Sequence, residues 1–237
     1  MLGGTIKATD DAGNTTTVDQ NHTTLGASLK IRVKEKTAPS ITITAPSAGA
    51  YITTVTPAIE FQVKDTDSGV NAGTIAVTVD GTAVSNITKT AIDGGYKCTC
   101  TSPTLKDGSH TISVKASDND GNAAVAKTAT FTIDTVPPTL QITAPSNDLI
   151  TNQKAVTVTG KTDDATSKPV TVTVNGVAVT VGTDGTFTKE VTLAEGANTI
   201  TIVAKDKAGK TTTVTRRVNR QHISSCDQVN LRFRPIR

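Results

Sequence analysis

The sequence contains no tryptophan, only two tyrosines and only four phenylalanines among 237 residues. Phe61, Phe131 and Phe187 alternate with valine and isoleucine, so we expect these rings to face a core. Tyr51 and Tyr96 remain as candidates for the surface, and two rings are too few for a sugar-stacking platform. The composition therefore argues against a lectin-like site.

Cysteine and long apolar runs are also scarce. Cys98 and Cys100 are two residues apart on an expected strand, where side chains point the same way and bridge poorly. Cys226 lies alone near the end, so no disulfide framework or zinc site is expected. No apolar run reaches the length of a membrane span, and we expect no membrane insertion. The opening MLGGTIKATDD has no basic-then-apolar signal peptide. We therefore expect either a piece of a longer exported chain or a protein that does not use that route.

The chain has no strong excess of positive or negative charge, and its formal net charge is +3. Six of the seven arginines lie after residue 215, and the body of the chain is near neutral without them. This distribution argues against a nucleic-acid partner.

The chain is instead rich in threonine, valine and isoleucine, which favour strands. No long stretch has the apolar spacing of a helix. One phrase, Ala-x-Asp-x-x-Gly, is written three times, in KATDDAGN, KASDNDGN and AKDKAGK. Its aspartates, Asp10, Asp118 and Asp206, are spaced by 108 and then 88 residues, which is the size of a β-sandwich module.

Alternating apolar residues predict about seven strands in each of two modules. In the middle module they are Ile41, Ile43, Ile59, Phe61, Val63, Ile75, Val77, Val79, Val84, Ile87, Tyr96, Cys98, Cys100, Ile112, Val114, Ala116, Phe131 and Ile133. In the last module they are Leu140, Ile142, Val156, Val158, Val170, Val172, Val174, Val177, Val179, Val181, Phe187, Val191, Ile200, Ile202, Ala204 and Val214. The pair Asn175–Gly176 predicts a tight hairpin.

The repeated phrase predicts the turn of the last hairpin of each module. Aspartate caps a turn through its side chain, and glycine adopts the positive φ that the turn requires. The structural turn residues are therefore Asp10 with Gly13, Asp118 with Gly121, and Asp206 with Gly209.

The order DSGV, TVTVDG, LKDGSHTISVKASDNDGN and then VPP resembles the tandem bacterial Ig-like domains of surface proteins and adhesins. The resemblance is good over 37–134 and 137–219 and partial over 1–34. It implies an all-β fold of tandem seven-stranded immunoglobulin-like Greek-key β-sandwiches and an extracellular, cell-surface or virion-surface setting. It supplies no catalytic residues, and such domains serve many functions.

Short joints that contain proline, EKTAPS and DTVPPT, separate the modules. Proline restricts both its own φ and the preceding residue, so we expect semi-rigid joints and an elongated chain. The expected domains are an incomplete Ig-like module at 1–34, Ig-like domains at 35–135 and 136–219, and a basic tail at 220–237.

Paired aspartates are the best candidates for metal ligands. Asp65 and Asp67 share one loop, and Asp118 and Asp120 share another. Calcium takes six to eight oxygen ligands, and loops of sandwich domains can supply them. Each pair offers only two carboxylates, so turn capping competes with calcium binding. No other cofactor is expected.

The two ends differ from the modules. Two strands at 1–34 cannot bury a face by themselves, so this segment is a fragment of a longer repeat, packs on the middle module, or completes a sandwich with an identical subunit. In the tail, Val229, Leu231 and Phe233 alternate with polar residues, a pattern that suits strand donation. A disordered or non-native end is the competing interpretation.

The sequence thus predicts a non-enzymatic structural or adhesive spacer module of a bacterial cell-surface protein. One alternative is a subunit of an extracellular fibre or phage particle that assembles through the N-terminal hairpin and the tail. Another is an accessory Ig-like region of a secreted carbohydrate-active enzyme. The expected partners are neighbouring Ig-like modules, identical subunits, or a host or surface ligand.

Overall fold

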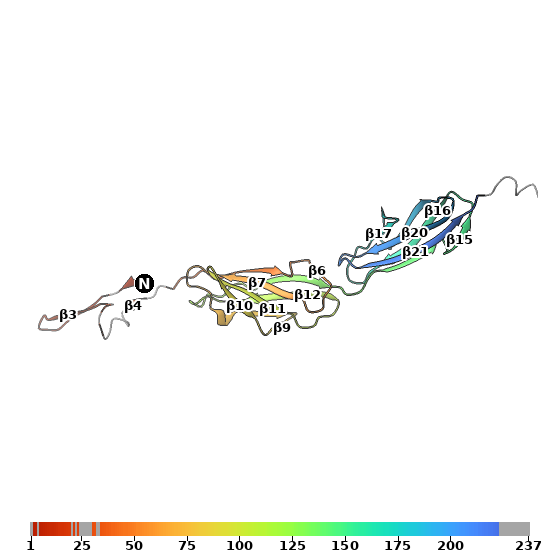
Figure 1. Ribbon diagram of the computed structural model, residues 1–237. Helices are drawn as coiled ribbons and strands as arrows, with labels where there is room; N and C mark the ends of the chain where they lie inside the picture. Colours follow the sequence, from red (N-terminus) through yellow and green to blue (C-terminus); the bar gives the residue numbers. More distant parts are fainter. Residues whose placement is uncertain are drawn as a thin grey trace, which may run out of the picture. The chain divides into compact units, whose positions relative to one another are not determined.

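The computed structural model describes residues 2–3, 5–19, 21, 23, 30–31 and 34–222. Within these residues the regular structure is β-strand apart from one 3-10 turn, Ala72–Thr74 (Figure 1). The predicted all-β class, with Ig-like sandwiches, is confirmed. No helix in this part of the chain is long and apolar enough to cross a membrane.

The first sandwich comprises strands β5 to β13. Their bounds are β5 (Ser40–Ala45), β6 (Tyr51–Ile52), β7 (Ala58–Lys64), β8 (Ala76–Val79), β9 (Thr82–Ala83), β10 (Thr88–Ile92), β11 (Gly95–Thr101), β12 (Gly108–Lys115) and β13 (Lys127–Ile133). One sheet has the order β10-β11-β7-β5 and the other β6-β13-β12-β8-β9. Strands β5 to β8 alternate between the two sheets, and β6 pairs in parallel with β13. The chain therefore crosses repeatedly between layers, as in a Greek-key sandwich.

The second sandwich repeats this plan with strands β14 to β21. Their bounds are β14 (Thr139–Ala144), β15 (Leu149–Thr151), β16 (Ala155–Asp163), β17 (Thr171–Val174), β18 (Val177–Val179), β19 (Thr186–Thr192), β20 (Gly196–Lys205) and β21 (Thr211–Arg220). Its sheets have the orders β14-β16-β19 and β15-β21-β20-β17-β18. Here β15 pairs in parallel with β21, as β6 does with β13.

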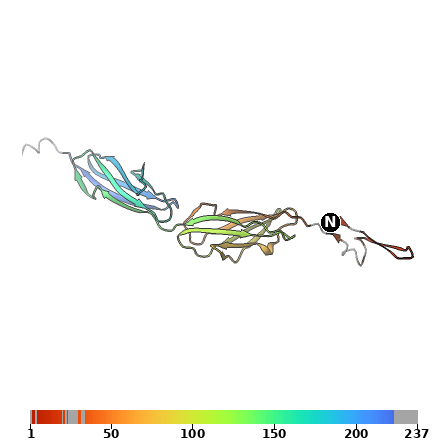
Figure 2. The same ribbon diagram turned by 180° about the vertical axis from the view of Figure 1, so that it is seen from behind.

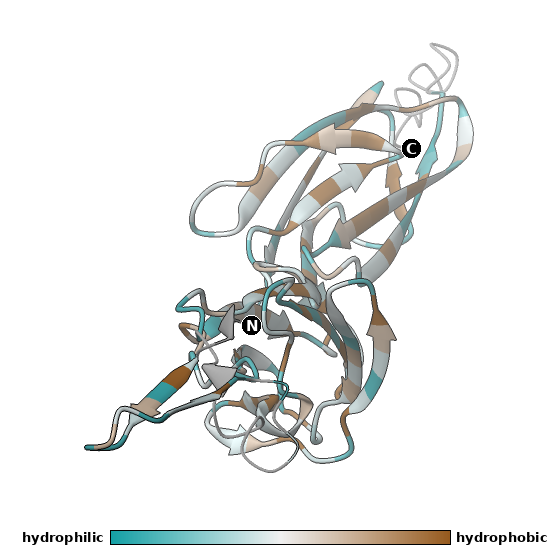
Figure 3. Ribbon diagram, turned by 90° about the vertical axis from the view of Figure 1, so that its left-hand side faces the viewer, coloured by the Kyte–Doolittle hydropathy of each residue, from teal (hydrophilic) through white to brown (hydrophobic). Residues whose placement is uncertain are grey.

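Alternate residues of the strands fill the two cores, and hydrophobic and polar residues alternate along the ribbons (Figure 3). In the first core Ile59, Phe61 and Val63 of β7 are fully buried. In the second core, Val158, Ile200 and Ile202 are at most 1% exposed. Each such side chain stabilises the fold by about 1.5–3 kcal/mol relative to leaving it in water.

One predicted strand is wrong. The apolar spacing of Val84 and Ile87 predicts a strand, but β9 ends at Ala83 and the next strand, β10, begins at Thr88. Asn86 between them has a φ of 60°. A left-handed residue interrupts the extended backbone, so the apolar spacing here does not mark a strand.

Several turns contain residues with positive φ. Asn175 and Gly176 have φ values of 49° and 80°, so the tight hairpin between β17 and β18 is confirmed. Gly13, Gly121 and Gly209 have φ values of 84°, 94° and 89°. The three copies of the repeated phrase therefore share one turn conformation.

The N-terminal segment contains two short strand pairs, which Figure 2 shows from behind. β1 (Leu2–Gly3) pairs with β4 (Lys30–Ile31), and β2 (Ile6–Thr9) pairs with β3 (Thr15–Val18). Ile6 is 57% exposed. The candidate assembly residues Val229, Leu231 and Phe233 lie outside the described residues, and the domain boundaries stay predictions.

Candidate metal-binding sites

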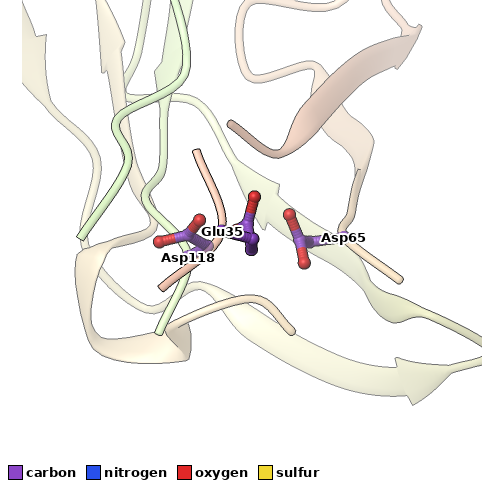
Figure 4. Close-up of side chains that lie close together, drawn as sticks. All are labelled: Glu35, Asp65 and Asp118. Carbon is purple, nitrogen blue, oxygen red and sulfur yellow. The ribbon is translucent and has the colours of Figure 1, made fainter. Parts of the chain in front are cut away.

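Three carboxylates converge in the first sandwich. We call Glu35, Asp65 and Asp118 the first carboxylate cluster: one carboxylate oxygen from each lies within 4.8 Å of those of the other two. Figure 4 shows the Glu35 side chain between those of Asp118 and Asp65. Asp65 directly follows β7, and Asp118 opens the turn after β12. The structure thus brings together one member of each predicted aspartate pair and adds Glu35, which sequence reasoning did not single out.

The first cluster is densely hydrogen-bonded by its own sandwich. The Asn122 side-chain amide donates to Asp118 Oδ2 at 2.6 Å and to Glu35 Oε1 at 3.1 Å. The Ser68 hydroxyl donates to Glu35 Oε1 at 3.0 Å, and the Gly69 N–H donates to Asp65 Oδ1 at 2.8 Å. Polar donors of the protein therefore already satisfy these acids.

The pKa of Asp118 lies well below its ordinary value. Burial acts to raise this pKa, but a hydrogen bond shared with the Glu35 carboxyl group and hydrogen bonds from the side chain and N–H of Asn122 outweigh it. The carboxylate of Asp118 is thus held in its charged form although the residue is only 1% exposed.

The other two predicted calcium ligands take different places. Asp67 is exposed, and its N–H donates to Asp65 Oδ1 at 3.1 Å. Asp120 Oδ2 accepts a hydrogen bond of 3.1 Å from the N–H of Glu35. Asp120 therefore holds the segment that leads into the first sandwich. Neither Asp67 nor Asp120 belongs to the first carboxylate cluster.

A second group of carboxylates lies at the equivalent place of the second sandwich. We call Asp134, Asp164 and Asp206 the second carboxylate cluster; here too, one oxygen from each lies within 4.8 Å of those of the others. They directly follow β13, β16 and β20, and their exposed fractions are 0%, 5% and 5%. Each cluster falls wholly within one of the two compact units of the chain.

Backbone and hydroxyl donors orient the second cluster. The Thr166 and Ser167 N–H groups donate to Asp164 Oδ1 at 2.8 and 2.7 Å. The Ser167 hydroxyl donates to Asp134 Oδ2, and the Lys210 N–H donates to Asp206 Oδ1 at 2.8 Å. The second oxygen of Asp206, Oδ2, is buried and has no hydrogen-bond partner in the structure.

The two clusters correspond residue by residue. Glu35 and Asp134 are the first residues of the joints EKTAPS and DTVPPT. Asp65 and Asp164 follow a long strand, and Asp118 and Asp206 open the repeated turn. Asn122 and Lys210 both lie four residues after that turn aspartate, and both donate their N–H to it. The clusters differ in that only Asn122 adds a side-chain amide.

A signal for this correspondence exists in the sequence. Aligning SITITAPS with LQITAPS pairs Glu35 with Asp134, and aligning the repeated turns pairs Asp118 with Asp206. Neither the repeated turns nor the aspartate pairs within one loop include the acidic residue that begins each joint.

The strand topology defines an Ig-like class of sandwich, and comparison with known families agrees. Residues 39–114 match the sequence model of the family described as "Bacterial Ig domain", and residues 138–222 match that of "Glucodextranase, domain B". Each match covers less than half of the chain. The predicted resemblance to tandem bacterial Ig-like domains is confirmed. No curated protein matches the sequence.

Several solved structures are similar to the chain. The fibronectin(III)-like modules of CbhA from Clostridium thermocellum are 19% identical, with a TM-score of 0.47 over 84% of this chain and 100% of that one. The titin I-band fragment I67-I69 is 13% identical, with a TM-score of 0.46 over 77% of this chain and 65% of that one. Latent PorU from Porphyromonas gingivalis is 17% identical, with a TM-score of 0.37 over 81% of this chain and 21% of that one.

Proposed function

We propose that the chain is a non-enzymatic structural spacer of an extracellular bacterial protein. One repeated observation carries this proposal: the acidic residue that begins each joint is hydrogen-bonded to the sandwich that follows it. Glu35 donates its N–H to Asp120 and accepts from Asn122 and Ser68. Asp134 accepts from the Ser167 hydroxyl. Joints tied to their sandwiches transmit force through folded modules, as a spacer requires.

The proposal is tested by stretching the whole chain from its two ends in single-molecule force spectroscopy. Two unfolding events are expected, one for residues 40–133 and one for 139–220. Fully extended at about 3.3–3.6 Å per residue, the two segments span roughly 310–340 Å and 270–300 Å, and each event should lengthen the chain by that span less the folded distance between the segment's ends. Smooth extension without such events would overturn the proposal, because a chain that yields at low force cannot hold two attached parts apart.

A second candidate is an accessory region of a carbohydrate-active enzyme. The match of residues 138–222 to glucodextranase domain B favours it. The test joins this chain to a dextran-cleaving catalytic domain and compares the rates on soluble and insoluble substrate with those of the catalytic domain alone. A gain confined to insoluble substrate supports the accessory function, and equal rates argue against it.

Assembly by strand donation is favoured by the exposed N-terminal hairpin. Ile6 and Ala8 precede the turn as Val114 and Ala116 do in the first sandwich, where those residues are 0% and 3% exposed. Ile6 is 57% exposed. Light scattering of the chain with and without residues 1–34 decides: oligomers that disappear on deletion support assembly, and a monomer in both cases excludes it.

A further inference from the structure

We infer that the second carboxylate cluster, Asp134, Asp164 and Asp206, binds one calcium ion. This inference rests on charge and burial and is independent of the spacer proposal. Three acidic side chains that are at least 95% buried hold oxygens within 4.8 Å of one another. Within the described residues no lysine, arginine or histidine forms an ion pair with them. Buried charges without a partner are costly, so a cation held by the three carboxylates would stabilise this part of the fold.

A buried carboxylate oxygen without a hydrogen-bond partner favours a bound cation. Asp206 Oδ2 is buried and accepts no hydrogen bond. The corresponding oxygen of the first cluster, Asp118 Oδ2, accepts the amide of Asn122 at 2.6 Å. Lys210 occupies the sequence position of Asn122, and its backbone N–H donates to the other oxygen of Asp206, Oδ1. The second cluster thus has acids at the three corresponding positions but no side-chain amide on its turn aspartate, so Asp206 Oδ2 keeps a lone pair for an external cation.

The donor atoms select the ion. All three acids offer oxygen, the Ser167 hydroxyl lies beside Asp134 and Asp164, and the group contains no sulfur or imidazole nitrogen. This set is unlike zinc sites, which use cysteine and histidine. Magnesium usually keeps several waters and takes one or two carboxylates, whereas calcium accepts several carboxylates in flexible geometry. Backbone N–H groups donate hydrogen bonds to one oxygen of Asp164 and to one oxygen of Asp206. These bonds orient the two acids for such a ligand.

Calcium binding is measured on the whole chain after removal of metal with EDTA. Titration with calcium chloride in a calorimeter should give one ion per chain, with a dissociation constant near the ~0.1–1 mM of extracellular calcium modules. Hydrogen exchange should slow at residues 164–167 and 206–210 and stay unchanged at 65–69 and 118–122. At calcium a hundredfold above the dissociation constant, the midpoint of the transition of the second sandwich should rise by about 10 °C or more.

Three variants locate the ion. Asp206→Asn should lose calcium binding and should melt higher than the parent chain when both are free of calcium, because it removes one unpaired charge. Lys210→Asn should weaken calcium binding at least tenfold, since its amide would compete for Asp206 Oδ2. Asp118→Asn, the matched change in the first cluster, should bind calcium like the parent chain.

Absence of calcium binding by the parent chain would overturn the inference. Binding that survives both Asp206→Asn and Lys210→Asn would also overturn it, because the ion would then lie elsewhere. Loss of binding in Asp118→Asn would assign the ion to the first cluster. The Lys210→Asn variant alters an accessible part of the turn, so it keeps the test decisive if Asp206→Asn fails to fold.

Discussion

The side-chain amide of Asn122 lies 2.6 Å from Oδ2 of Asp118, and the same amide donates to the backbone carbonyl of Glu35 at 2.9 Å. One asparagine therefore serves a buried carboxylate of the turn and the chain that enters the sandwich. Replacing Asn122 with alanine leaves both acceptors without this donor. A buried acceptor left unsatisfied costs about 1–3 kcal/mol.

Asn122→Ala should accordingly lower the free energy of unfolding of the first sandwich by about 1–3 kcal/mol in urea denaturation. Asn14→Ala is the matched control. Asn14 Nδ2 donates to Asp10 Oδ2 at 2.9 Å in the same turn of the N-terminal hairpin, but both residues are exposed. Asn14→Ala should change the free energy of unfolding by no more than about 0.5 kcal/mol. Equal losses in the two variants would contradict the role given to burial.

The strands are more predictable from the sequence than the sites, for a physical reason. Period-2 alternation follows directly from strand geometry, so the spacing of Ile59, Phe61 and Val63 is enough to predict their buried face. The turn of Asn175 and Gly176 is equally readable because positive φ restricts the choice of residue. Val84 and Ile87 mislead, since apolar spacing does not reveal the left-handed Asn86 between them.

The carboxylate clusters depend on contacts over long sequence separations. Pairing Asp65 with Asp67 relies on proximity along the chain, but their loop points them to different surroundings, one buried and one exposed. Sequence spacing cannot show that Glu35 reaches Asp118, because that contact depends on how the strands close into a sandwich.

The lowered pKa of Asp118 predicts acid sensitivity of the first sandwich. A carboxyl group with a folded pKa below its unfolded value, about 3.9, stabilises the fold fully above the unfolded pKa. That contribution disappears as pH falls towards the folded pKa. The free energy of unfolding of the first sandwich should therefore be steady near neutral pH and fall below about pH 4.

Urea denaturation of Asp118→Asn at a series of pH values checks this expectation. The variant should be less stable than the parent chain at pH 7, and the difference should shrink as pH falls below about 4. A difference that stays constant over the whole range would show that Asp118 acts through its shape rather than its charge.

The thiols of Cys98 and Cys100 should be unreactive in the folded protein. Both are free and buried, at 0% and 8% exposed. Burial raises the pKa of each thiol, which depletes the reactive thiolate. In a Cys226→Ser variant, which leaves only these two thiols, a disulfide reagent at pH 8 should label neither before unfolding and both in denaturant. Rapid labelling of the folded chain would mean that β11 opens locally.

Gly95 at the start of β11 should not tolerate a side chain. A Cβ added there would lie 2.0 Å from the Val63 carbonyl oxygen and 3.0 Å from the Lys64 Cα, both backbone atoms that cannot swing aside. Gly95→Ala must therefore push β11 away from β7, which adjoins it in the sheet. Overpacking costs about 1–3 kcal/mol, and rigid backbone neighbours place this change near 3 kcal/mol.

Gly73→Ala is the control: its Cβ would meet only the side-chain oxygen of Asn71, at 3.3 Å. In thermal unfolding, the midpoint of Gly95→Ala should lie clearly below that of the parent chain, and the midpoint of Gly73→Ala should lie within a few degrees of it. Equal midpoints for the two variants would mean that β11 can shift without loss of pairing.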